Sequence, residues 1–255
     1  MIDTMAVSHT KLLPRMMLLH NRLTYRVLIA CILLFATVAS GSAQQIRTAS
    51  QFLQRLSEEY AGFEDYMADI VVTTERERMA GTLYHRRPNL LNIEFTQPQD
   101  QFIITDGQFL RVHVPSLNTT LSQRLRSTAD APGGIATAEG LALLRRNFSV
   151  AFQASPDFVG VNSTGNFIEP VGPDTQVVNL RFDTSTPDEG YRQLVISVDA
   201  DYRIRRIVGT TVDLNRVQFD FTNVRVNQGL PDSRFEYVSP PASSTFEDFL
   251  FDSAN

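Results

Sequence analysis

Polar and apolar residues alternate along most of this chain with a period of two, which places every second side chain of a β-strand on one face. Between Tyr66 and Leu125, short turn signals such as Asp106-Gly107 separate the alternating segments. Connections this short join antiparallel neighbours, so the pattern predicts a meander. The predicted strands are 66–76, 78–87, 90–97, 101–105, 108–114 and 119–125, followed by 150–154, 158–161, 166–171, 176–183, 191–199, 203–213, 215–226 and 233–238.

Two segments follow the helical period instead. Residues 48–61 can be capped by Thr48 or Ser50, and Thr137–Phe148 follows a break in the β pattern at 127–136. Their apolar stripes consist of Phe52, Leu53, Leu56 and Tyr60 in the first helix and of Leu141, Leu144 and Phe148 in the second. We therefore predict a mainly β fold with helices (α+β), in which two helices cover the inner face of a curved antiparallel sheet. A loose fit between them would leave a cavity.

The N-terminus has the three parts of a secretory signal peptide. Basic residues precede an apolar run at 27–39 and small residues follow it, so we expect cleavage between Ala43 and Gln44. The run of about 13 residues is shorter than the ~20 of a membrane-spanning helix. A lipid-modified Cys31 is the alternative, although this cysteine lies inside the apolar run rather than at its end.

We expect three parts along the chain: a cleaved signal peptide (1–43), one binding domain (44–240) and a C-terminal tail (241–255). A domain of about 200 residues has a core large enough to fold without disulfides. The tail is polar except for four residues that can form a short docking helix, and that either pack locally or contact a partner: Phe246, Phe249, Leu250 and Phe251.

The composition excludes several classes of function. Removal of residues 1–43 takes away four of the 23 basic and one of the 28 acidic residues, which leaves a net charge of −8. This charge has the wrong sign for binding nucleic acid through its phosphates. The remaining chain has no Cys, Lys or Trp and two histidines, His85 and His113, so it lacks a thiol nucleophile, a Schiff-base amine and a histidine-rich metal site. We expect no catalytic residues, no metal and no cofactor.

The stretch 81–115 carries the most specific pattern in the chain. Ten positions follow, without a gap, the pattern G-x-L-x-x-x-R-P-N, then a strand ending in Pro, then S/T-D-G-x-x-L: Gly81, Leu83, Arg87, Pro88, Asn89, Pro98, Asp106, Gly107, Leu110 and Pro115. In this pattern the stretch resembles the LolA family of periplasmic lipoprotein carriers. Residues 234–241 resemble the family's closing strand, whereas Ile93 stands where an aromatic residue is frequent.

The resemblance implies an incomplete β-barrel whose apolar concave face is closed by a lid of helices. A carrier of this family takes the acyl chains of lipoproteins from an inner-membrane ATP-binding transporter that releases them. It then crosses the periplasm and delivers the lipoprotein to an outer-membrane acceptor. The chain would act there as a monomer, without enzymatic activity of its own and without nucleic acid as a partner.

The resemblance also implies roles for individual residues. Arg87 would face the cavity as a latch that donates hydrogen bonds to backbone groups of the lid helices. A solvated arginine at a hairpin end is the alternative, and it is our interpretation of Arg86. The lipid cavity would be lined by Leu83, Leu91, Ile93, Phe95, Phe102, Ile104, Leu110, Val112 and Val114, and His85 shares the parity of Leu83. The lid residues would be Phe52, Leu53, Leu56, Leu141, Leu144 and Phe148.

Alternatives to these assignments stay open. Ordinary core packing requires the same alternation as a lipid cavity, and a closed lid is itself part of a core. The same scaffold also suits a carrier of another lipid, or a lipid-anchored acceptor or lipoprotein sensor, which would need lipidation at Cys31 or a second domain. A hydrolase is disfavoured because the catalytic motifs are missing. A lipoprotein carrier is therefore the leading hypothesis.

Overall fold

The computed structural model describes residues 48–125, 136–163, 167–184 and 191–247, all within one compact unit, Arg47–Asn255. Several predictions lie outside the described residues: the signal peptide with Cys31, most of the break at 127–136, and the tail residues Phe249, Leu250 and Phe251. Among the residues that are described, no helix combines the length and the apolar composition needed to cross a bilayer.

Both predicted helices are confirmed, and each begins at a threonine cap. The first is α2 (Ala49–Ala61), where the Thr48 hydroxyl accepts a hydrogen bond from the Gln51 backbone N–H and the Gln51 side chain accepts one from the Thr48 N–H. The second is α3 (Ala138–Asn147), where the Thr137 hydroxyl accepts from the Gly140 N–H. These bonds satisfy backbone donors that a helix start otherwise leaves unpaired.

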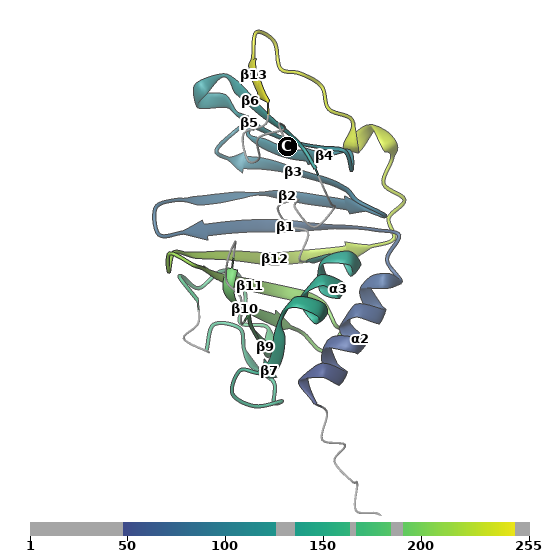
Figure 1. Cartoon of the computed structure of the whole chain (residues 1–255), viewed down its shortest axis with the longest axis vertical. Helices are drawn as coiled ribbons and strands as arrows, with labels where there is room; N and C mark the ends of the chain where they lie inside the picture. Colours follow the sequence, from purple (N-terminus) through teal and green to yellow (C-terminus); the bar gives the residue numbers. More distant parts are fainter. Residues whose placement is uncertain (1–47, 126–135, 164–166, 185–190, 248–255) are drawn as a thin grey trace, which may run out of the picture. The chain divides into compact units, whose positions relative to one another are not determined.

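The strands form one large sheet (Figure 1). Their order across it is β13-β6-β5-β4-β3-β2-β1-β12-β11-β10-β9-β7. The short strand β8 pairs with β9 but is not part of this order. The strands are β1 (Asp65–Thr74), β2 (Arg78–Arg86), β3 (Leu90–Gln97), β4 (Phe102–Thr105), β5 (Phe109–Val114), β6 (Thr119–Arg124), β7 (Ser149–Phe152), β8 (Val159–Gly160), β9 (Gln176–Asp183), β10 (Tyr191–Val198), β11 (Ile204–Thr211), β12 (Arg216–Val226) and β13 (Ser244–Glu247).

This topology confirms the predicted fold class of a mainly β chain with helices and one curved, unclosed sheet. Strands β1 to β6 form the predicted antiparallel meander. After α3 the chain continues at the far edge with β7 and returns through β9, β10 and β11, so that β12 pairs with β1. The described strands therefore leave the barrel incomplete, with β13 and β7 at opposite edges.

Two predicted strands are wrong. Within the prediction at 166–171, the Ile168 N–H donates to Oε1 of Gln218 and the Glu169 carbonyl accepts from Nε2 of the same side chain. The prediction at 233–238 coincides with a 3-10 turn, η4 (Asp232–Phe235), and a following stretch with no strand assignment. The Gln218 side chain takes the place of a partner strand at Ile168 and Glu169, which an alternating pattern in the sequence does not reveal.

The C-terminal tail also differs from the expectation. Phe246 lies in strand β13, which pairs in parallel with β6, so a docking helix at this position is wrong. The backbone hydrogen bond from Ser244 to Asn118 and the side-chain bond from Asn118 to Ala242 hold the entry to this strand. The tail thus extends the sheet by one edge strand.

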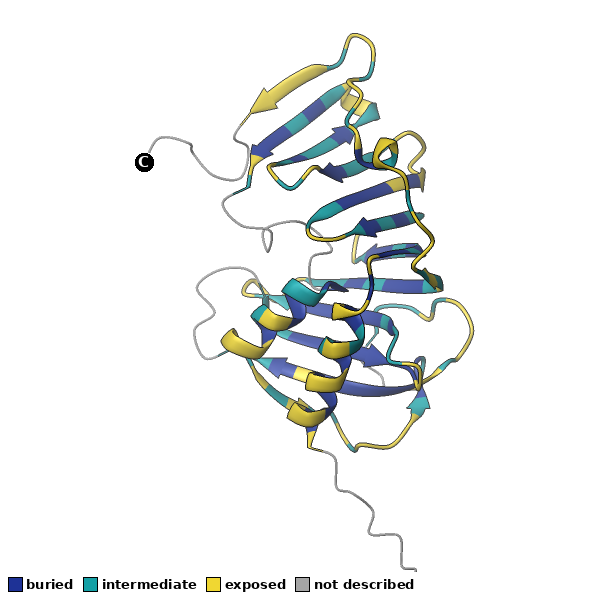
Figure 2. Ribbon diagram, turned by 90° about the vertical axis from the view of Figure 1, so that its right-hand side faces the viewer, coloured by how far each residue is buried: buried dark blue, intermediate teal, exposed yellow. Residues whose placement is uncertain are grey.

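The two faces of the sheet are covered by different parts of the chain (Figure 2). Helices α2 and α3 lie over one face at β12 and the strands beyond it towards β7 (Figures 1 and 2), and we call this the helix face. The segment 230–240 packs on the opposite face of β2 and β3, through ion pairs of Arg86 with Asp232 and of Arg234 with Glu94. We call this opposite side the C-terminal face.

A buried ion pair holds the sheet at β11 and β12, away from the helices. Nε of Arg206 donates to Oδ1 of Asp220 at 2.6 Å, and the remaining guanidinium nitrogens donate to the Val161 carbonyl and to Oδ1 of Asn162, both at 3.0 Å. Gln218 donates to the other carboxylate oxygen of Asp220 at 2.6 Å. Burial raises the pKa of Asp220, against the lowering effect of Gln218 and Arg206. Each guanidinium nitrogen and each carboxylate oxygen thus has a partner, and losing one residue of the pair would leave a buried charge.

We expect the substitution Arg206→Met to lower the free energy of unfolding by about 3–5 kcal/mol, because it leaves Asp220 buried without its counter-ion. Urea denaturation followed by circular dichroism measures this loss. The control is Arg181→Met, which removes a surface pair with Asp183 whose side chains are 44% and 40% exposed. Its expected cost is below about 1 kcal/mol. Equal losses in both variants would contradict the larger contribution to the free energy of unfolding that we assign to the buried pair.

Candidate functional site

One row of apolar side chains crosses the sheet on its helix face. The strand registers place successive residues of this row opposite one another on β1 to β6 and β13: Ala68, Leu83, Ile93, Ile103, Val112, Leu121 and Phe246. Cross-strand partners point to the same side of a sheet. Ala68, Leu83 and Ile93 belong to the core that includes the buried residues of α2, so the whole row lies on the helix face.

Burial decreases along this row towards the edge of the sheet. Leu83 is 0% and Ile93 3% exposed, Ile103, Val112 and Leu121 are half-buried, and Phe246 is 59% exposed. Figure 2 shows α2 and α3 over the other half of the sheet, beyond β1. The row thus passes from a packed core to an apolar surface that the two helices leave uncovered. Binding of an apolar ligand to such a surface is stabilised by roughly 25 cal/mol for each Å² of apolar area that becomes buried.

The six predicted lid residues pack into the same core as the sheet. Five of them are buried and Phe148 is half-buried: Phe52, Leu53, Leu56, Leu141, Leu144 and Phe148. Polar contacts add to this packing, because the Tyr60 hydroxyl accepts from the Ile204 N–H at 3.0 Å and the Tyr66 hydroxyl donates to the Ala136 carbonyl at 2.8 Å. Burial raises the pKa of Tyr60 to about 12. The helices are therefore held down mainly by apolar contacts.

Seven of the nine predicted cavity residues lie on the helix face: Leu83, Leu91, Ile93, Phe95, Leu110, Val112 and Val114. The grouping is wrong for Phe102 and Ile104, which pair with Glu94 and Asn92 on the C-terminal face. Their neighbour Ile103 occupies the helix face instead. Because β4 has three apolar residues in succession, its sequence does not indicate which of them face the helices. The register with β3 decides this.

Arg87 lies just after β2, beside the C-terminal end of α2. Its Nη1 donates to the Ala61 carbonyl at 2.8 Å, and its backbone N–H donates to the Glu64 carbonyl at 3.0 Å. The last carbonyls of a helix have no partner within the helix, so Arg87 supplies one. The side chain is exposed and reaches the helix end from the solvent rather than from an enclosed cavity. The predicted contact with a lid helix is thus present as one solvent-accessible hydrogen bond.

The interpretation of Arg86 as a solvated arginine is wrong. Its Nη2 pairs with Asp232 at 2.6 Å, its Nη1 donates to the Leu230 carbonyl at 2.8 Å, and its guanidinium lies 5.2 Å from the centre of the Phe235 ring. Neighbouring residues of a strand point to opposite faces. Arg86 therefore holds the segment 230–240, while Arg87 contacts α2.

His85 is buried on the helix face, 4% exposed, with its ring centre 5.1 Å from that of Tyr66. Neither ring nitrogen has a hydrogen-bond partner among the described residues. Burial, reinforced by the charge of Arg87, lowers the pKa of His85 to about 4, against an opposing effect of Asp65. The imidazole is therefore neutral at neutral pH and stands next to the contact between Arg87 and α2.

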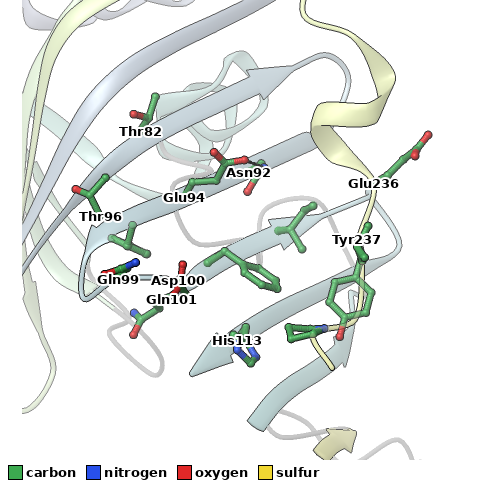
Figure 3. Close-up of a pocket in the computed structure, with 15 residues that line it drawn as sticks. Thr82, Asn92, Glu94, Thr96, Gln99, Asp100, Gln101, His113, Glu236 and Tyr237 are labelled. Carbon is green, nitrogen blue, oxygen red and sulfur yellow. Dashed lines mark hydrogen bonds between the residues drawn. The ribbon is translucent and has the colours of Figure 1, made fainter. Parts of the chain in front are cut away.

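A pocket of about 770 Å³ opens on the C-terminal face (Figure 3). Its walls come from β2 to β5, the turn after β3 and the segment 236–240. Phe102 and Ile104, which were predicted to line the lipid cavity, line this pocket instead. Asn92 and Glu94 lie on one side of it and His113 and Tyr237 on the other (Figure 3). Within the described ranges, no group of three or more His, Cys, Asp or Glu side chains is placed to hold a metal ion.

Comparison with known proteins agrees with the sequence pattern. Residues 71–150, which contain β2 to β6 and α3, match the family described as outer membrane lipoprotein carrier protein LolA. The outer-membrane lipoprotein carrier protein of Salmonella paratyphi A is 25% identical over 225 residues, which cover 88% of this chain and 98% of that protein. The carrier protein of Pseudomonas putida is 20% identical over 222 residues, which cover 87% and 97%. The predicted resemblance to the LolA family is thus confirmed.

Among solved structures, an uncharacterized conserved protein from Thermus thermophilus aligns with 78% of this chain and 98% of its own, at 10% identity and a TM-score of 0.49. The fold assignment rests on the strand order of this chain itself. The description of the matched family is that of a carrier, which agrees with the prediction that the chain is not an enzyme.

The low pKa of His85 predicts a loss of stability in acid. Between pH 6.5 and about 4 the unfolded chain holds a proton on this side chain that the folded chain does not, so stability falls as the pH is lowered through this window. The loss amounts to about 3 kcal/mol at pH 4. We expect His85→Leu to remove this component, measured by urea denaturation at pH 7, 5.5 and 4.

The control is His113→Leu, which replaces an equally buried histidine whose Nδ1 lies 3.1 Å from the Thr120 hydroxyl. It should retain the loss between pH 6.5 and 4, whatever its stability at pH 7. If His85→Leu loses as much stability over this range as the unchanged protein, burial of a neutral His85 is not the cause.

Proposed function

We propose that this LolA-like chain is a periplasmic carrier, which binds the acyl chains of lipoproteins on its helix face and moves them from the inner to the outer membrane. The observation that carries the proposal is the apolar row from Leu83 to Leu121, whose outer half is half-buried and not covered by α2 or α3. The matched family and the two relatives support it, since both relatives are named as outer-membrane lipoprotein carrier proteins.

The energetics of acyl chains require such a carrier. Each CH₂ group moved out of water contributes about 0.8 kcal/mol, so exposing one 16-carbon chain costs roughly 12 kcal/mol. A lipoprotein with several chains needs an apolar shield to cross an aqueous space. The helix face can supply it, because its residues are apolar and its two helices are held down mainly by apolar contacts that a lipid can replace.

In this proposal α2 and α3 are the lid and the helix face is the floor. The bound chains contact the seven predicted residues on this face together with Ile103 and Leu121. The hydrogen bond from Arg87 to the Ala61 carbonyl closes the lid at the C-terminal end of α2. An exposed hydrogen bond contributes little, about 0.5–1.5 kcal/mol, which suits a contact that must break and re-form in each transfer.

The parts of the chain and its partners complete the proposal. Residues 1–43 act as a cleaved signal peptide, 44–240 as the lipid-binding domain and 241–255 as a tail whose first part is β13. An ATP-binding transporter of the inner membrane supplies the acylated lipoprotein, and an acceptor at the outer membrane takes it. The carrier works as a monomer.

The apolar row predicts the effect of placing a charge in its outer half. We expect Leu121→Glu to weaken binding of a tripalmitoylated cysteinyl peptide by at least tenfold, because the bound chains would have to desolvate a carboxylate. Displacement of a fluorescent fatty acid from the mature protein measures the affinity.

The matched control is Leu117→Glu, the same substitution at a side chain that is 71% exposed in the turn before β6. It should bind the lipopeptide as the unchanged protein does. The lipid-binding proposal fails if both variants bind equally well. Binding of free fatty acid but not of the lipopeptide would instead point to a carrier of another lipid.

The contact between Arg87 and Ala61 predicts a second effect. We expect Arg87→Leu to slow release of the lipopeptide several-fold, because the closed, empty form loses the bond that favours it over the open form. Stopped-flow transfer to acceptor vesicles measures the rate. The control is Arg76→Leu, an exposed arginine in the turn at the other end of β2, which should release at the normal rate. Unchanged release in Arg87→Leu would rule out the latch.

A further inference from the structure

We propose that the outer edge of β6 is a strand-addition site for the peptide that follows the acylated cysteine of a bound lipoprotein, and that β13 occupies this edge in the empty carrier. The inference rests on the proposed lipid binding and adds a second part of the same ligand to it. Figures 1 and 2 show β13 at the edge of the sheet, where it is exposed along its whole length.

Few contacts hold β13 in place. All four of its residues are exposed, and Phe246, its one large apolar side chain, is 59% exposed and lies outside the core. Among the residues that the structure describes, no side chain of this strand forms a hydrogen bond or an ion pair. Backbone pairing with β6 therefore supplies most of its stabilisation. Short strands of this kind, with little buried apolar surface, open at a low free energy.

The turn before β13 is a separate anchor. The Asn118 carbonyl accepts from the Ser244 N–H at 3.0 Å, and Nδ2 of Asn118 donates to the Ala242 carbonyl at 2.9 Å. The hydroxyls of Ser243 and Thr120 lie 3.1 Å apart. All of these contacts lie at or before the first residue of the strand. The rest of β13 can therefore leave β6 without unfolding another element.

Strand β6, in contrast, is built as an interior strand. Thr120 is 0% and Ser122 8% exposed, and Leu121 between them is half-buried. If β13 leaves, the N–H and C=O groups on the outer edge of β6 lose their partners, and such an edge is a template for another extended segment. Main-chain hydrogen bonds place few demands on sequence, which suits ligands whose peptide parts differ.

The position of Phe246 indicates which segment replaces β13. This residue lies opposite Leu121 and is the last member of the apolar row, on the face that we propose for the acyl chains. A strand added to β6 therefore starts where the bound chains end. A lipoprotein carries both parts in one molecule, since its acyl chains are attached to the cysteine from which the peptide leads away.

Tethering explains why this peptide can compete with β13. The strand is attached to the sheet through the segment 230–240, so its effective concentration at β6 is on the order of millimolar. A free peptide has to exceed this concentration to displace it. A peptide whose acyl chains are bound on the helix face is tethered to the same molecule and competes on similar terms.

The test compares tripalmitoylated cysteine amide with the same molecule extended by Ser-Gly-Ser-Thr-Phe-Glu-Thr, by displacement of a fluorescent fatty acid from the mature protein. We expect the extended ligand to bind at least fivefold tighter. The Ser244 N–H points to β6, so the N–H of Phe246, two residues further on, points there too. N-methylation of the Phe in the tail should therefore remove the gain, whereas N-methylation of the Thr before it should not.

A disulfide links the gain to β13. Ser122 and Glu247 lie opposite one another on the C-terminal face, and the chain has no cysteine after residue 43. The double variant Ser122→Cys with Glu247→Cys can thus fix β13 to β6. When oxidised, it should bind the extended ligand no more tightly than the tripalmitoylated cysteine amide. Reduction of the same protein should restore the gain, which makes the reduced form the control.

Hydrogen exchange gives an independent readout. With the extended ligand bound, the amides of β13 should exchange faster while those of β6 stay protected. Equal affinity for the two ligands, or a gain that the oxidised disulfide does not reduce, would overturn the inference and leave lipid binding intact. If neither ligand binds, the lipid-binding proposal fails and this inference with it. Equally tight binding of the free peptide without acyl chains, or a dimer formed by exchange of β13, would show a different occupant and overturn the assignment to the lipoprotein.

Discussion

The structure depends on one constraint: a single antiparallel sheet presents an apolar face that is longer than its two helices. Cross-strand pairing places Leu83, Ile93, Ile103, Val112 and Leu121 in one continuous row, because residues opposite each other in a sheet point the same way. Helices α2 (Ala49–Ala61) and α3 (Ala138–Asn147) lie over the part beyond β1, and the row becomes half-buried at Ile103, Val112 and Leu121. A fold built only for stability would cover this face. An incomplete cover is useful when an apolar ligand has to enter and leave.

The alternation of the strands gives the two faces different chemistry. The helix face carries mainly apolar residues and one neutral histidine, His85, whose ring nitrogens have no hydrogen-bond partner among the described residues. The C-terminal face carries arginines, carboxylates and aromatic rings, and the segment 230–240 packs on it. Arg86 and Arg87 show the division within one dipeptide: the first binds the C-terminal segment and the second the end of α2. Helix closure and pocket formation thus depend on neighbouring residues of the same strand end.

Much of the fold could be predicted from the sequence, since local patterns govern it. Helix starts at Thr48 and Thr137, the first six strands and the long strands β9 to β12 follow directly from periodicity, caps and turns. The errors share a cause. The parity of Phe102-Ile103-Ile104, the role of Arg86 and the absence of a strand at 167–171 each depend on a partner distant in the chain: β3, Asp232 and Gln218. An alternating pattern indicates which side chains share one face of a strand, but it does not indicate which part of the chain covers that face.

The sequence by itself determined a mainly β chain with two capped helices, an acidic surface without lysine or cysteine after residue 43, and a resemblance to lipoprotein carriers in 81–115. These properties reside in single residues or in neighbours along the chain. Only the tertiary structure decided which apolar residues share the helix face, that Arg86 pairs with Asp232, and that Arg206 is buried against Asp220. Strand register and the return of the chain after β12 bring these groups together, and both depend on long-range packing that no local pattern encodes.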